Sequence, residues 1–345
     1  MPTTASSAGS MPTSAADVQD ARLGNLQALR ALAALAVVLF HVIETSVHQQ
    51  RPVQGLAPLS GWGAWGVDLF FVLSGFVMVH AQQRRPRTAA RFLADRLWRI
   101  VPLYWLLTLA VVLLQALRPG LFHGALAEGS QVLASLGFLA GAWLGRPPVL
   151  WLGWTLEWEM AFYGLFALGL LLPWRAGPAL GVAVGLAGLI GLGADALGLE
   201  FLLGMGLAAL HHRLPAQRPW APWLLGLGAL GLLASLGQPA PAQRLLHWGL
   251  PAALLVMGAL GLRQTRWAPG QWLGDASYSI YLVQALSVPA LYRLLRLWPG
   301  LDADLAALAV IVGTVGAGLA CHRWVERPLL QLRPRLRAAL SPPRP

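Results

Sequence analysis

Long apolar runs, separated by short polar or arginine-bearing segments, dominate this chain from residue 26 to residue 324. A bilayer core about 30 Å thick is crossed by roughly 20 apolar residues of helix, and hydrocarbon leaves no alternative partner for backbone polar groups. The runs therefore predict an all-α fold, a polytopic bundle of about ten transmembrane helices. We place them at approximately 26–45, 63–81, 99–117, 154–172, 178–194, 197–211, 220–237, 245–262, 273–295 and 304–324.

The composition agrees with this interpretation and excludes other classes. Only 11% of the residues are charged, 57% are hydrophobic, and the mean hydropathy is +0.59. The net charge of +11 comes without any lysine, and its arginines lie in short clusters between the apolar runs. Such clusters are typical of topology signals, so we expect no nucleic-acid partner. The single cysteine, Cys321, excludes an intrachain disulfide.

Arginine placement predicts the orientation. With ten spans and a cytoplasmic amino terminus, nineteen of the 25 arginines fall on the cytoplasmic side. An eleventh span at 132–145 would mix the two sides, so we interpret that segment as interfacial or re-entrant. We expect residues 1–22 to be a disordered cytoplasmic tail, 23–328 the transmembrane domain, and 329–345 a basic cytoplasmic tail.

Ionisable residues lie inside several predicted spans. Arg30 and His41 are eleven residues apart on one helix, about 16 Å along nearly the same face. Asp68 lies in the outer half of the second span, and the fourth span opens with Glu157 and Glu159. Two glutamates two positions apart cannot both face the interior of a bundle. Such residues are costly in a membrane and are functional candidates, although a helix-end anchor or structural partner is the alternative for each one.

A set of motifs resembles the membrane acyltransferase-3 family, and most closely its members that modify exopolysaccharides. The motifs are Arg30 followed by His41, "GVDLFFVLSGFVM" at 66–78, "RLWRIVPLYW" at 96–105, "GWTLEWEMAFY" at 153–163, "GDASYSIYLVQ" at 274–284 and "ERP" at 326–328. The resemblance implies a multi-pass enzyme of the bacterial cytoplasmic membrane. It would move an acyl group, often acetyl, from cytoplasmic acyl-CoA to a hydroxyl of a carbohydrate or lipid-linked glycan. It also favours Glu159 over Glu157.

Acyl transfer to a hydroxyl needs a base, and His41 is the natural candidate because a neutral imidazole accepts a proton near pH 7. A carboxylate on its other ring nitrogen would fix the tautomer, and Asp68 and Glu159 are both candidates for this role. An acyl-histidine intermediate, with His41 as the nucleophile, is the rival route.

The anionic donor calls for guanidinium groups, which bind phosphate oxygens through paired hydrogen bonds. We predict that Arg30, Arg96 and Arg99 bind the donor, with Tyr104 packing against it. The family motif at 153–163 adds Trp154, Thr155 and Tyr163 as candidates for substrate binding. Topology signalling is the alternative role for Arg96.

Other features set limits on this hypothesis. We expect no resident cofactor, with acyl-CoA acting only as a co-substrate, and no metal site. Ser74 and Gly75 indicate close helix packing. Gln284 stands where the family often has a histidine, which argues against proton transfer at that position. A proton-coupled transporter is the alternative function. The acyl group, the acceptor and the oligomeric state stay open.

Overall fold

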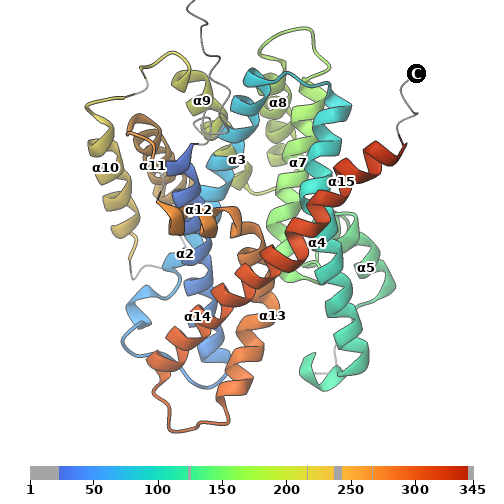
Figure 1. Ribbon diagram of the computed structural model, residues 1–345, viewed down its shortest axis with the longest axis vertical. Coiled ribbons are helices and arrows are strands. Elements are labelled where there is room, and N and C mark those ends of the chain that lie inside the picture. Colours follow the sequence, from blue (N-terminus) through green and yellow to red (C-terminus); the bar gives the residue numbers. More distant parts are fainter. Residues whose placement is uncertain (1–22, 123–125, 216, 237–242, 266, 341–345) are drawn as a thin grey trace, which may run out of the picture.

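The computed structural model describes residues 23–122, 126–215, 217–236, 243–265 and 267–340. All regular structure in these residues is helical, which confirms the predicted all-α class (Figure 1). The predicted disordered tail at 1–22 lies outside the described residues.

Four helical stretches in the described part of the chain are long and apolar enough to cross a membrane by themselves. They are Gly24–His48, Ala57–Arg84, Ala89–Leu117 and Ala303–Arg333. The first and third are single helices, α2 (Gly24–His48) and α4 (Ala89–Leu117). The length and apolar composition of these helices are those of a membrane protein.

Every predicted span coincides with a helix or with two joined helices. The number of membrane crossings and the cytoplasmic position of the termini stay predictions. The remaining principal helices are α3 (Trp65–Arg84), α7 (Trp154–Gly169), α8 (Gly177–Gly191), α9 (Leu199–His211), α10 (Ala221–Leu233), α11 (Leu250–Gly261), α12 (Ala268–Asp275), α13 (Ser277–Leu295), α14 (Ala303–Cys321) and α15 (Arg327–Leu340). Two π-helical turns, Leu245–Gly249 and His322–Glu326, precede α11 and follow α14.

Helix α4 begins well before the predicted span. Thr88 caps it by accepting a hydrogen bond from the backbone N–H of Arg91 at 3.3 Å. Arg91 and Arg96, which precede the predicted span at 99–117, therefore lie in the first part of α4. Because Arg96 and Arg99 are three residues apart on this helix, they share one face.

Helices α3 and α9 pack closely through two glycines. A Cβ atom on Gly75 would lie 2.1 Å from the carbonyl oxygen of Phe201, and one on Gly204 would lie 2.0 Å from that of Val72. No larger residue fits at either position without moving a backbone. The expectation that Gly75 serves close helix packing is confirmed.

The segment 132–145 does not form a continuous span. It is divided between two short helices, α5 (Gly129–Leu136) and α6 (Ala140–Leu144). Glu157 of α7 accepts hydrogen bonds from the backbone N–H groups of Ala140 and Gly141, at 2.9 and 3.0 Å, and so caps α6.

Buried aromatic rings fill the space between α3, α7 and α9. Phe201 stacks on Phe71 and on Phe162, with ring centroids 4.4 and 4.3 Å apart.

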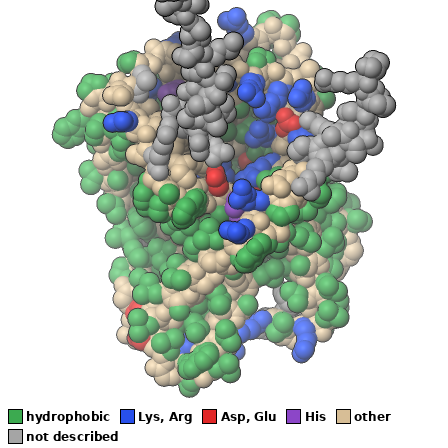
Figure 2. All heavy atoms as spheres, in the orientation of Figure 1, with side chains coloured by type: hydrophobic (Ala, Val, Ile, Leu, Met, Phe, Trp, Pro, Cys, Tyr) green, Lys and Arg blue, Asp and Glu red, His purple; other side chains and the backbone are tan. Residues whose placement is uncertain are grey.

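Hydrophobic side chains cover most of the face in Figure 2, whereas arginine side chains gather mainly in its upper centre.

Candidate functional site

A pocket that is partly open to solvent lies between α2, α3, α4, α7 and α13. It brings together six of the ten residues predicted for the site, from three separate helices. These six are Arg30, Arg96, Arg99, Thr155, Glu159 and Tyr163.

Arg30 enters the pocket from α2 and is held at the start of α13. Its Nη2 donates to Ser277 Oγ at 3.0 Å, and its Nε donates to the carbonyl oxygen of Gly274 at 3.4 Å. The remaining N–H groups of the guanidinium are left for other partners.

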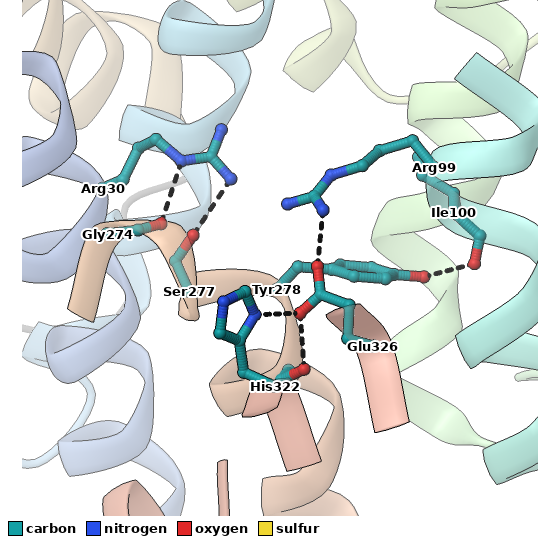
Figure 3. A network of polar contacts seen from close by, with 9 residues as sticks. Arg30, Arg99, Ile100, Gly274, Ser277, Tyr278, His322 and Glu326 are labelled. Atoms are coloured by element: carbon teal, nitrogen blue, oxygen red, sulfur yellow. Dashed lines mark hydrogen bonds and ion pairs between the residues drawn. The ribbon is translucent and has the colours of Figure 1, made fainter. Parts of the chain in front are cut away.

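Arg99 enters from the opposite side, on α4. Its Nη1 pairs with Glu326 Oε1 at 2.6 Å, and its guanidinium lies over the ring of Tyr278, 5.9 Å from the centroid. Figure 3 shows the side chains of Arg30 and Arg99 reaching toward each other.

Arg96 lies one turn before Arg99 on the same helix. Its Nε is buried and has no hydrogen-bond partner among the described residues, while its guanidinium lies 5.9 Å from the ring centroid of Phe92. A buried donor without a partner is rare in proteins, and here it lies on the lining of a pocket.

Glu159 supplies the carboxylate of the pocket. It accepts hydrogen bonds from Ser74 Oγ at 3.1 Å and from the hydroxyl of Tyr163. Glu157, on the other face of α7, caps α6 instead. The structure therefore separates the two glutamates as the helix geometry requires, and Ser74 has a polar role beyond helix packing.

Positive charge exceeds negative charge on the pocket lining. The described lining has three guanidinium groups and one carboxylate, that of Glu159, and Glu326 lies behind Arg99. Guanidinium groups in a partly desolvated pocket favour an anionic ligand, and their planar arrangement of N–H groups suits phosphate oxygens.

His41 is buried next to the pocket but does not line it. Its Nδ1 lies 3.1 Å from Gln284 Oε1, and its ring makes edge contacts with Phe40 and Trp151, at centroid distances of 4.8 and 4.6 Å. The amide nitrogen of Gln284 donates to the carbonyl oxygen of Tyr281 at 2.9 Å. The oxygen of Gln284 must therefore face His41 as an acceptor, so Nδ1 bears the proton and Nε2 is the basic nitrogen.

The partner of His41 is not one of the two carboxylates that we considered. Neither Asp68 nor Glu159 bonds the ring, and Gln284 fixes the tautomer in their place. The only signal for this residue was its place in the "GDASYSIYLVQ" motif, which we had interpreted as a departure from the family pattern. A neutral amide orients the imidazole without adding a charge beside it.

Gln284 and Tyr281 connect His41 to the wall of the pocket. Tyr281 lines the pocket, and its hydroxyl lies 2.7 Å from Thr155 Oγ1 and donates to the carbonyl oxygen of Leu152 at 3.0 Å. The ring nitrogen of His41 is thus linked to the pocket wall through Gln284 and Tyr281.

Asp68 has a different role from the one we expected. Its fully buried carboxylate forms an ion pair with Arg244, with Oδ2 2.5 Å from Nη2 and Oδ1 3.3 Å from Nε. The buried carboxyl group of Glu200 lies beside it. Asp68 therefore joins α3 to the turn before α11, away from the pocket lining.

Tyr104 and Trp154 do not line the pocket either. Tyr104 is fully buried, and its ring stacks on Phe138 at 4.7 Å between centroids. Trp154 begins α7 and packs against the apolar core. The structure gives both residues packing contacts in the apolar core.

Comparisons with known proteins agree with this arrangement. A family model described as an acyltransferase domain matches residues 23–323. The chain is 38% identical over 321 residues to the exopolysaccharide production protein ExoZ of Rhizobium meliloti (strain 1021), covering 85% of this chain and 95% of that relative. No solved structure matches the chain.

Proposed function

The chain belongs to the acyltransferase-3 family, and from this premise we propose that it transfers an acyl group from a cytoplasmic acyl-CoA to a hydroxyl of a glycan. We take the enzyme to be a multi-pass protein of the bacterial cytoplasmic membrane, with acetyl as the acyl group and an exopolysaccharide or its lipid-linked precursor as the acceptor. The name of the relative, an exopolysaccharide production protein, supports this class of acceptor.

The arginine pocket is the observation on which the proposal depends. Arg30 and Arg99 converge on one space, and Arg96 has a buried nitrogen without a described partner nearby. A CoA thioester has several phosphate groups, which would be the anionic ligand of these guanidiniums. A membrane protein with a purely structural role would not need three guanidinium groups around one cavity.

His41 is proposed as the general base. The acceptor oxygen would attack the thioester carbonyl carbon as its proton passes to Nε2, and the C–S bond would then break. The imidazolium would return the proton to the departing thiolate, so no net proton is consumed. In the alternative route Nε2 itself attacks the carbonyl carbon, and the acceptor removes the acyl group in a second step.

The position of His41 defines what must move. Tyr281 and Thr155 both line the pocket and hydrogen-bond to each other, and the backbone of Tyr281 is also bonded by Gln284, the partner of His41. We propose that donor binding displaces this pair. The acceptor would approach from the side of Trp151, whose exposed ring touches His41.

The test uses purified full-length protein in lipid nanodiscs, with isotopically labelled acetyl-CoA and the glycan of the producing cell. We expect release of CoA, a mass increase of one acyl group on the glycan, and a loss of at least about a hundredfold in His41→Ala, which is typical of a missing general base. Ser287→Ala on α13 is the matched control, because Ser287 contacts Thr314 and not His41. If the wild-type protein leaves the thioester intact in nanodiscs but moves the glycan across the membrane of sealed proteoliposomes, it is a transporter instead.

A further inference from the structure

Glu326 is a buried carboxylate that the chemistry above does not use. Its side chain is 1% exposed and lies in the π-helical turn His322–Glu326, which connects α14 to α15. Three side chains from three different segments converge on its two oxygens, as Figure 3 shows in part.

The two oxygens divide their partners. Oε1 accepts from Arg99 Nη1 at 2.6 Å. Oε2 accepts from Ser279 Oγ at 2.6 Å and from His322 Nδ1 at 2.7 Å. Ser279 and His322 thus hold the carboxylate in place through Oε2, and Oε1 in turn holds the guanidinium of Arg99.

Arg99 needs such support because another cation faces it. The side chain of Arg99 is 32% exposed, and a long side chain with that freedom has many rotamers. Arg30 reaches toward it across the pocket, and two like charges at close range repel. A carboxylate behind Arg99 offsets that repulsion and leaves the other N–H groups of the guanidinium directed into the pocket.

We propose that Glu326 is a positioning residue, which holds Arg99 in the pocket opposite Arg30 and thereby sets the affinity for the phosphate-bearing donor. The proposal rests on the proposed function. It assigns to the C-terminal part of the chain a role in donor binding that no resemblance or relative supplies.

A structural alternative can be separated from this role, because α15 has a second attachment to α4. Asp95 of α4 forms ion pairs with Arg333 of α15 at 2.5 Å and with Arg87 at 3.2 Å. Asp95→Asn therefore weakens the attachment of α15 and keeps both partners of the ion pair between Arg99 and Glu326. This variant is the matched control. If Glu326 acted only by docking α15, Asp95→Asn should have a similar effect.

The experiment measures KM for acetyl-CoA, kcat, and the dissociation constant of CoA in the purified protein. We expect Glu326→Gln to raise KM and the dissociation constant about tenfold, the size of one charge-assisted hydrogen bond, with kcat changed less than about twofold. Glu326→Asp should recover most of the affinity because it keeps the charge. Asp95→Asn should leave all three constants within about twofold of the wild-type values.

A double-mutant cycle decides whether Glu326 acts through Arg99. If it does, Arg99→Gln with Glu326→Gln has the same KM as Arg99→Gln alone, since nothing is left to position. This comparison can be made even where Glu326→Gln alone folds poorly. The double variant removes both charges of the ion pair, so neither is left buried without its partner. Additive effects, or an unchanged KM in Glu326→Gln, would overturn the positioning role. A wild-type protein that neither binds CoA nor consumes acetyl-CoA would contradict the proposed function and this inference with it.

Discussion

At the scale of single residues, the neutral partner of His41 is the most informative contact. Gln284 donates to the carbonyl oxygen of Tyr281 and so presents its oxygen to Nδ1. The tautomer of the imidazole is then set by a helix backbone rather than by a second charge. Nε2 is left as the basic nitrogen, which suits the proposed role of His41 whether as base or as nucleophile.

Removing this contact should slow the chemical step. We expect Gln284→Leu to lower kcat about tenfold, equivalent to about 1.4 kcal/mol, because the ring loses the hydrogen bond that fixes its tautomer. Gln284→Glu should keep or raise kcat, since a carboxylate at the same place stabilises the imidazolium. The measurement is steady-state kinetics at saturating acetyl-CoA, and Gln284→Leu with wild-type kcat would remove the amide from the mechanism.

Like His41, the buried carboxylate of Asp68 has a polar partner that is far away in the sequence, but here the partner, Arg244, is charged. A buried carboxylate in an apolar bundle persists only when it is paired, and the guanidinium of Arg244 provides that pairing. Arg244 also lies over the ring of Trp248, 4.7 Å from its centroid. The sequence made Asp68 a candidate for the carboxylate that orients His41, whereas in the structure it pairs with Arg244 and joins two segments of the fold.

At the scale of elements, the packing of α3 on α9 determines the shape of the pocket wall. Helix α3 presents Ser74 and Phe71 to the pocket and Gly75 to α9. Since the two backbones touch at Gly75 and Gly204, the position of α3 against α9 is fixed there. The carboxylate of Glu159 depends on that position through its hydrogen bond with Ser74.

Enlarging the contact between these helices should disrupt the fold. A Cβ atom at Gly204 would lie 2.0 Å from a carbonyl oxygen, whereas at Gly206 on the same helix it would meet open space. We expect Gly204→Ala to lower the melting temperature in detergent and the yield of folded protein. Gly206→Ala should be neutral or slightly stabilising, because alanine favours a helix by about 1 kcal/mol over glycine. Equal melting temperatures for the two variants would show that α3 and α9 can separate without cost.

At the scale of the whole molecule, the protein is a helical bundle with a cationic pocket and, beside it, a buried histidine. Arg30 and His41 belong to one helix, α2, so the pocket and the imidazole of His41 have a fixed separation along its axis. This geometry suits a donor that enters from one side of the membrane and an acceptor that enters from the other. It depends on the orientation of the bundle in the bilayer.

The orientation can be measured by cysteine labelling. After Cys321→Ser, single cysteines are placed in the predicted outer loops at Arg118 and Arg146 and in the predicted inner segments at Arg85 and Arg175. We expect a membrane-impermeant maleimide to label only the first two in intact cells, because the arginine distribution directs the other two inward. Labelling at Arg175 from outside would mean that 132–145 crosses the membrane.

The sequence by itself determined the helical class and the position of the apolar helices. It also identified the three arginines and the glutamate that line the pocket. Hydropathy, helical period and motif spacing are local properties, and they act over the few turns that a single run contains. Tertiary structure alone decided which partner each polar group has. His41 and Gln284 are 243 residues apart, Asp68 and Arg244 are 176 apart, and Arg99 and Glu326 are 227 apart. A local pattern cannot specify such pairs, because they are selected by the burial of every polar group against the one complementary group that packing brings within reach.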